Sequence, residues 1–185
     1  MVSRQRAESG YTLVELMIVV AIIGVLATLA TYGVRKYILA AKTSEGIEML
    51  RGIKEAEELY KHETFTYKAT SLTPASYFPW DDGLPKDGKK KYFECAGCPA
   101  QAAWKELNVS TNQPVQFAYV VITGVAGAVP AQHPDWKSSP AAGFPATPGD
   151  IWYVAYAAAD LNGDGKALVY AGTSFSTEIL SNAGD

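Results

Sequence analysis

The architecture of this chain is decided by residues Leu16–Val34, LMIVVAIIGVLATLATYGV, which hold no formal charge over nineteen positions. A helix of about 20 apolar residues, rising 1.5 Å per residue, is long enough to cross the roughly 30 Å hydrocarbon layer of a bilayer. Three interpretations compete: a permanent anchor, a cleaved secretory signal, and a segment that waits in the membrane before it joins an assembly. Secretory signals normally have a hydrophobic region of only about 7 to 15 residues, so the length of the run disfavours the second.

Composition excludes several function classes for the rest of the chain. The 185 residues are 48% hydrophobic and 19% charged, which fits one globular domain plus a substantial extra element. The formal net charge of -3 lacks the basic excess of a dedicated nucleic-acid binder, so no nucleic acid partner is indicated. Two histidines and two cysteines argue against multi-histidine metal centres and cysteine-rich zinc folds.

The helical pattern continues beyond the apolar run. No proline occurs before Pro74, and apolar or small residues recur at spacings of three and four. These residues are Gly46, Met49, Ile53, Ala56 and Tyr60. We therefore predict one helix from residue 11 to about 62, with an apolar half at 11–34 and an amphipathic half at 35–63 that packs on the chain's own sheet.

A globular head is expected at residues 64–185. Its first part, to about Asn112, is rich in turn residues, and three strands are predicted from runs of β-branched and aromatic residues. The predicted strands are Val115–Thr123, Ile151–Ala158 and Ala167–Ala171. The proline-rich segment Gly124–Asp150 is interpreted as an extended surface loop. The predicted fold class is α+β, a long N-terminal helix packed on a small antiparallel sheet.

A short motif, GYTLVE at positions 10–15, leads into the apolar run and follows a polar leader that carries Arg4 and Arg6. Together with the run, it resembles the N-terminus of type IV prepilins, whose class III signal sequence is cut after a glycine by a dedicated peptidase. The resemblance covers about the first 55 residues. It implies a leader at 1–10, cleavage between Gly10 and Tyr11, and N-methylation of Tyr11, which replaces the family's usual Phe.

Glu15 is the residue that the resemblance makes most informative. A carboxylate at the edge of an apolar run is usually there for a partner or a function. The family implies that it pairs with the new α-amino group of a neighbouring subunit and so sets the register of adjacent helices. The alternative is a residue that merely flanks the span at the level of the lipid headgroups.

The implied function is that of a structural subunit of a type IV pilus, used for surface motility, adhesion or DNA uptake. The implied partners are identical or related pilin subunits, the prepilin peptidase and an assembly platform in the inner membrane. The chain would be a single-pass precursor in that membrane and then part of an extracellular filament. The alternatives are a pseudopilin of a type II secretion system and a single-span anchored binding module that does not polymerise.

Helix shape is the point at which this sequence departs from many relatives. Tyr32 stands where many pilins have a helix-kinking proline, and the nearby Gly24 and Gly33 keep their backbone donors. We therefore expect a helix that is continuous between Gly24 and Tyr32.

Cys95 and Cys98 form a C-x-x-C motif with three interpretations: a redox pair, half of a metal site, or a small structural disulfide. A redox motif would normally open a helix after a strand, and one pair without further ligands is weak evidence for zinc. In the exported domain that the resemblance implies, a disulfide is favoured. It would close a loop too short to stabilise more than a local turn.

A second local motif joins the last two predicted strands. Oxygen-bearing side chains stand at alternate positions, Asp160, Asn162 and Asp164, followed by Gly165 and Lys166, as at the start of a calcium loop. The twelfth position would be Ala171 instead of the bidentate glutamate. A β-hairpin turn is favoured over a calcium site. In the calcium alternative, the backbone carbonyl of Lys166 would add a further ligand. The predicted function requires no cofactor, and calcium binding at this loop is kept as an alternative.

No sequence feature predicts an enzyme. The chain contains neither a phosphate-binding P-loop nor a G-x-S-x-G nucleophile motif, and no catalytic pair stands out. His62 and His133 are interpreted as solvated.

Overall fold

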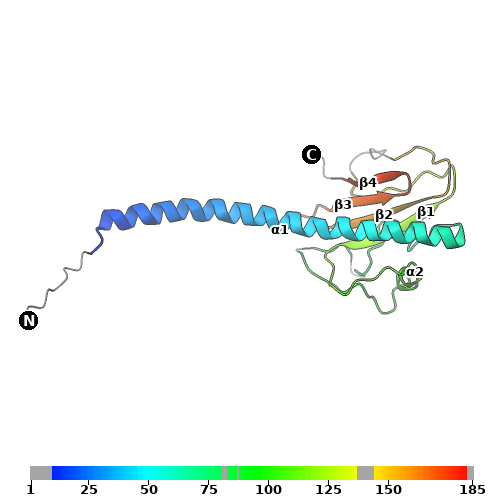
Figure 1. Ribbon diagram of the computed structural model, residues 1–185, viewed down its shortest axis with the longest axis horizontal. Coiled ribbons are helices and arrows are strands. Elements are labelled where there is room, and N and C mark those ends of the chain that lie inside the picture. Colours follow the sequence, from blue (N-terminus) through cyan, green and yellow to red (C-terminus); the bar gives the residue numbers. More distant parts are fainter. Residues whose placement is uncertain (1–9, 81–82, 87, 137–143, 183–185) are drawn as a thin grey trace, which may run out of the picture. The chain divides into compact units, whose positions relative to one another are not determined.

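The computed structural model describes residues 10–80, 83–86, 88–136 and 144–182, and its first element is a single long helix. Helix α1 runs from Leu13 to Thr64 without interruption, in close agreement with the predicted bounds (Figure 1). It continues through the positions of Gly24 and Tyr32, which confirms the expected continuity. The leader positions 1–9, with Arg4 and Arg6, lie outside the described residues.

Two compact units divide the chain, residues 1–40 and residues 41–185. The first holds the apolar part of α1. The second, which we call the head, holds the rest of α1 together with helix α2 and a four-stranded sheet.

The sheet of the head is an antiparallel meander in the order β1-β2-β3-β4. Its strands are β1 (Ala118–Gly124), β2 (Trp152–Ala159), β3 (Leu168–Thr173) and β4 (Ser176–Ser181). The first three match the predicted strands to within a few residues. The predicted α+β fold class is confirmed.

Both faces of this sheet are covered, which explains why β2 is buried at all eight of its residues. On one face, Leu50 and Ile53 of α1 share a core cluster with Tyr119 of β1 and Tyr153 of β2. Figure 1 shows this part of α1 lying along the sheet. A separate cluster, which includes Val154 and Tyr156 of β2, covers the other face.

The second cluster corrects the interpretation of segment Gly124–Asp150 as a surface loop. Trp136 and Phe144 of this segment are buried against β2, and the Tyr156 hydroxyl donates a hydrogen bond of 2.9 Å to the Ala131 carbonyl. Residues 137–143 lie outside the described residues. The segment is therefore the second cover of the sheet, because its aromatic side chains occupy the face that α1 leaves free.

Two short elements were missed in the sequence. Helix α2 (Ala100–Glu106) has only two turns, and it buries Trp104 in the core cluster beside α1. Strand β4 lies at the edge of the sheet, and its residues are only partly buried or exposed, so it carries no strong hydrophobic alternation.

Close contacts fix the packing of the second part of α1, which belongs to the head, on the sheet and its loops. A Cβ atom added at Gly46 would lie 3.1 Å from the Phe117 ring, so the glycine allows close approach at this point. Further along, the Lys54 ammonium donates hydrogen bonds to the carbonyls of Thr173 and Ser176 at the turn between β3 and β4.

Candidate functional site

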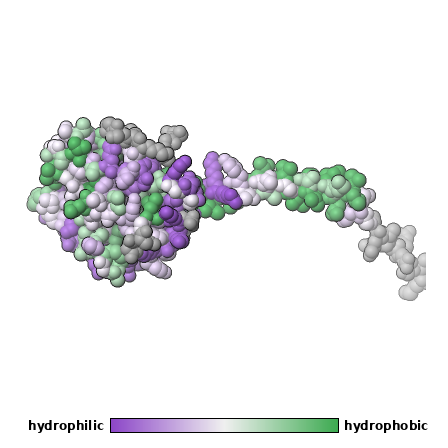
Figure 2. Space-filling view, turned by 180° about the vertical axis from the view of Figure 1, so that it is seen from behind, coloured by the Kyte–Doolittle hydropathy of each residue, from purple (hydrophilic) through white to green (hydrophobic). Residues whose placement is uncertain are grey.

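The apolar part of α1 exposes its hydrophobic side chains on every side. Every residue from 10 to 41 is exposed, and large hydrophobic side chains between Leu13 and Val34 are at least 50% accessible. Figure 2 shows these side chains gathered over this part of the helix. By length and composition, α1 is apolar enough to cross a membrane, and it is the one such helix among the described residues. So large an apolar surface indicates burial in lipid or against other chains.

Thr12 and Glu15 form a reciprocal capping box at the start of α1. The backbone N–H and the hydroxyl of Thr12 donate to Glu15 Oε2 at 2.9 and 2.8 Å, and the Glu15 N–H donates to Thr12 Oγ1 at 3.2 Å. This arrangement satisfies backbone donors that a helix N-terminus otherwise leaves open, and it places a negative charge where the helix dipole favours it. The T-x-x-E spacing was present in the sequence and could have predicted this cap.

The cap leaves one oxygen of Glu15 free for another partner. Both Thr12 donors use Oε2, and no donor among the described residues bonds to Oε1. The carboxylate is therefore held in one position with an acceptor available to an external cation.

The predicted processing site lies just outside the helix. Tyr11 is 91% exposed, and apart from its chain neighbours no described atom lies within 4 Å of the place where a Cβ would stand on Gly10. A peptidase could therefore approach the Gly10–Tyr11 bond without unwinding α1, which begins two residues later.

The C-x-x-C motif closes a turn immediately before α2. Cys95 and Cys98 are joined in a disulfide with Cα atoms 5.4 Å apart, and the Cys98 N–H donates to the Cys95 carbonyl at 3.2 Å. The Gln101 side chain accepts the Cys95 N–H at 2.8 Å, and Cys95 packs in the core. The pair fastens the loop to the first turn of α2.

The Asp160–Lys166 segment forms the turn between β2 and β3. Asp160 is buried, and its two carboxylate oxygens accept the N–H groups of Gly163 at 2.7 Å and Gly165 at 2.9 Å. Asp164 accepts the Lys166 N–H at 2.8 Å and a hydrogen bond from the Asn162 side chain. The predicted hairpin connection is present, and its carboxylates bind the loop's own donors. The described residues contain no group of three or more His, Cys, Asp or Glu placed to hold a metal ion.

His133 was wrongly interpreted as solvated. It is 2% exposed and lies between the rings of Tyr77 and Tyr156, at centroid distances of 5.9 and 5.7 Å. Its Nδ1 accepts the Asp135 N–H at 3.2 Å, and burial lowers the pKa of the imidazole below 6.5. The covering segment buries this histidine, so nothing local in the sequence predicted it. His62 is exposed, as expected.

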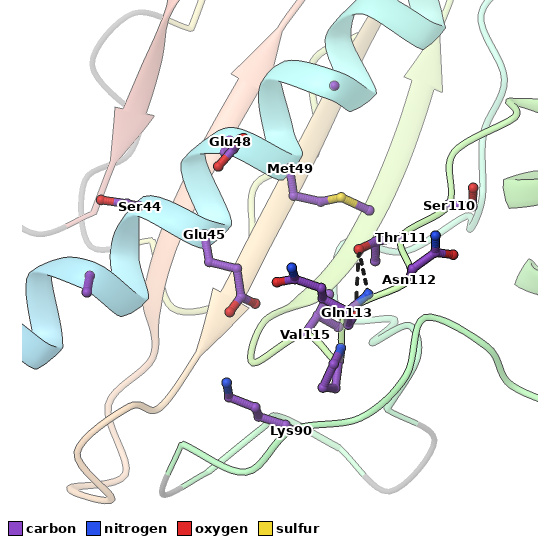
Figure 3. A pocket seen from close by; sticks show the side chains of 13 residues that line it. Ser44, Glu45, Glu48, Met49, Lys90, Ser110, Thr111, Asn112, Gln113 and Val115 are labelled. Atoms are coloured by element: carbon purple, nitrogen blue, oxygen red, sulfur yellow. Dashed lines mark hydrogen bonds between the residues drawn. The ribbon is translucent and has the colours of Figure 1, made fainter.

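An open groove of about 790 Å³ lies between α1 and the segment Ser110–Val115 (Figure 3). Glu45 extends from α1 into this region, and its carboxylate accepts the Gln116 N–H at 2.6 Å. Lys90 lies at one end of the groove, and Thr111 and Gln113 bond to each other on the far wall. Among the described residues, the lining contains no histidine or cysteine.

A long helix with an exposed apolar half, followed by an α+β head, is the arrangement that the resemblance to type IV prepilins implied. The family described as the prokaryotic N-terminal methylation motif matches residues 5–31. A fimbrial protein of Moraxella nonliquefaciens is 48% identical over 48 residues, which are 26% of this chain and 31% of the relative. The type IV major pilin protein PilE1 of Neisseria gonorrhoeae is 38% identical over 89 residues, 47% of this chain and 50% of the relative.

A fimbrial protein of Dichelobacter nodosus is 42% identical over 71 residues, 37% of this chain and 42% of the relative. The chain thus spans half or less of the length of these relatives. No solved structure matches it. The resemblance to type IV pilins with a class III signal sequence is confirmed for the N-terminal part of the chain.

Proposed function

We propose that this protein is a structural subunit of a type IV pilus. A prepilin peptidase cleaves the chain between Gly10 and Tyr11 and methylates the new N-terminus. The subunit waits as a single-pass protein of the inner membrane, and an assembly platform transfers it into a helical filament. The observation that carries the proposal is the exposed apolar half of α1, most of which lies within the match to the methylation motif.

We propose that Glu15 sets the register between adjacent helices in the filament. Cleavage would create a positive α-amino group on Tyr11 of every subunit, close to the depth of the Glu15 carboxylate of a neighbour. The capping box supports this role because it holds Oε2 and leaves Oε1 to accept such a cation. Pairing between subunits would remove two isolated charges from an apolar environment at once, and repetition of one such contact builds an open helical polymer.

The decisive experiment is electron microscopy of filaments sheared from the source cells, with mass spectrometry of their subunit. We expect filaments whose subunit begins at N-methylated Tyr11. An intact Met1 in the filaments would contradict the pilin assignment. So would a start at Thr31, which a secretory signal peptidase would produce by cutting after the small residues Thr28 and Ala30. Cells with a surface-exposed protein and no filaments would favour the single-span binding module.

The register is tested separately by Glu15→Ala. We expect a loss of filaments with the head still folded, because Glu15 belongs to the first compact unit and not to the head. Wild-type filament yield from this variant would remove Glu15 from assembly and leave the rest of the proposal standing.

A further inference from the structure

A carboxylate lies in the buried stripe of α1. The buried residues of the helix are Gly46, Leu50, Ile53 and Glu57, at spacings of four, three and four. Glu57 is 0% exposed, whereas glutamate is almost never fully buried unless it is paired. Its neighbours in the stripe pack on the sheet, so Glu57 occupies a position where an apolar side chain is expected.

The two oxygens of Glu57 differ in their surroundings. Oε2 accepts the backbone N–H of Lys68 at 2.9 Å, which holds the segment after α1 against the helix. Oε1 is buried and has no hydrogen-bond partner among the residues that the structure describes. Nothing in the described head therefore solvates the second oxygen of an ionised Glu57.

The charged and titratable groups around Glu57 do not neutralise it. On α1, Glu58 is a like charge that raises the pKa of Glu57. On the following segment, the Lys68 ammonium lowers this pKa, but it is already paired with Glu106 of α2. On β2, the Tyr153 hydroxyl is also buried and has no hydrogen-bond partner within the described part of the chain. Burial raises the pKa of that phenol, which stays neutral. No cation among these groups is dedicated to Glu57.

We propose that Glu57 is a proton-binding switch: the folded head holds it in the neutral form, and ionisation loosens the contact that fastens the segment after α1 onto the helix. An ionised carboxylate with an unsolvated oxygen gains hydration if that segment lifts away. Burial raises the pKa of Glu57 from 4.5 to about 7, although the Lys68 N–H opposes the shift. The switch concerns the head alone and does not depend on filament assembly.

The sign of the effect follows from the proton balance. Between about pH 4.5 and 7, the folded head keeps a proton that the unfolded chain has lost, so stability falls as the pH rises and levels off above pH 7. With these two pKa values, the unfolding equilibrium constant rises about 70-fold from pH 5 to pH 8 through Glu57 alone. Through Glu57, the contact with the segment after α1 is therefore more firmly closed in mildly acidic than in neutral surroundings.

The test compares two glutamates of α1 in the full chain, held in detergent micelles. Glu57→Gln keeps an acceptor for the Lys68 N–H but cannot ionise, and Glu55→Gln removes the same charge from an exposed position. Urea unfolding is followed by tryptophan fluorescence, because all four tryptophans lie in the head. The ratio of the wild-type to the Glu57→Gln unfolding constant should rise about 70-fold from pH 5 to pH 8. The same ratio for Glu55→Gln should stay constant.

Two measurements on the wild-type chain keep the proposal testable if Glu57→Gln fails to fold. The carboxyl carbon of Glu57, observed by NMR, should titrate with a midpoint near pH 7. Hydrogen exchange should show that the Lys68 amide loses protection above this pH by a larger factor than the Thr70 amide, which donates to the Val121 carbonyl at 2.9 Å.

Each unfavourable result has a definite meaning. A Glu57 midpoint below pH 5.5, or a ratio for Glu57→Gln that does not change with pH, would overturn the switch. Equal changes at Lys68 and Thr70 would show that ionisation does not act on this contact.

Discussion

Two leucines of α1 provide a test that separates the roles of its two halves. Leu50 is 0% exposed in the core of the head, whereas Leu29 is 65% exposed in the apolar half. The substitutions Leu50→Ala and Leu29→Ala remove the same atoms from the same helix. Any difference between their effects therefore reports on what surrounds each side chain.

The expected magnitudes follow from burial. Leu50→Ala leaves a cavity beside Ile53 and the sheet, so we expect a loss of about 3 kcal/mol in the free energy of unfolding of the head. For a domain of this size, such a loss lowers the melting temperature by roughly 6–12 °C. Leu29→Ala should change head stability by less than about 0.5 kcal/mol, because it removes no packed contact.

Assembly should show the opposite ranking. If the apolar halves pack together in a filament, Leu29 becomes buried there, and Leu29→Ala should lower the yield of sheared filaments. Head stability is measured by urea unfolding with tryptophan fluorescence, and filament yield by quantification of the sheared fraction at equal expression of the subunit.

Two results would refute this reasoning. Equal destabilisation of the head by both variants would mean that the apolar half packs on the head. Wild-type filament yield from Leu29→Ala would mean that this half does not form the filament core.

Three further predictions concern single sites. Thr12→Val removes the hydroxyl that holds Glu15 and should lower filament yield. The control Thr31→Val removes a hydroxyl that bonds to the Ala27 carbonyl and should leave the yield unchanged. Equal yields from the two variants would contradict the role of the cap. Removal of calcium with EGTA should leave the unfolding midpoint of the head unchanged, because both Asp160 oxygens already accept backbone donors; a midpoint that rises with added calcium would assign the turn to a metal site. Burial lowers the pKa of His133, so its contribution to stability is complete above pH 6.5 and is lost as the pH falls below that value. In urea unfolding, the free energy of unfolding of His133→Gln should therefore fall less on acidification than that of the wild type. An equal fall in both proteins would contradict this prediction.

The sequence predicted the elements whose physical cause is local. The span Leu16–Val34 is apolar all round, and β1 to β3 are rich in β-branched and aromatic residues, so periodicity and composition sufficed. The elements that were missed depend on tertiary contacts. Strand β4 exists because β3 offers an edge to pair with, and α2 is anchored by burial of Trp104.

The functional and buried polar residues divide in the same way, into those that a local pattern indicates and those that depend on tertiary contacts. Gly10, Tyr11 and Glu15 were proposed as site residues from a contiguous motif, and the cap by Thr12 was equally local although it was overlooked. Glu57 stands four residues after Ile53, so helical spacing could have placed it on the buried face, but the predicted stripe continued through Ala56 and Tyr60 instead. His133 could not be placed in this way, because a segment far from β2 in the sequence folds over that strand and buries it.

The apolar half of α1 narrows the functions that fit this chain. A docking helix for one partner needs a single apolar stripe, but here the exposed hydrophobic side chains surround the helix. Only lipid or a bundle of similar helices can cover every side. A permanent anchor needs lipid alone and has no use for a carboxylate fixed at the edge of the span with one oxygen free. A subunit that leaves lipid for a bundle needs a polar contact to define its register, and Glu15 stands where such a contact would form. This combination favours the filament subunit over the anchored binding module.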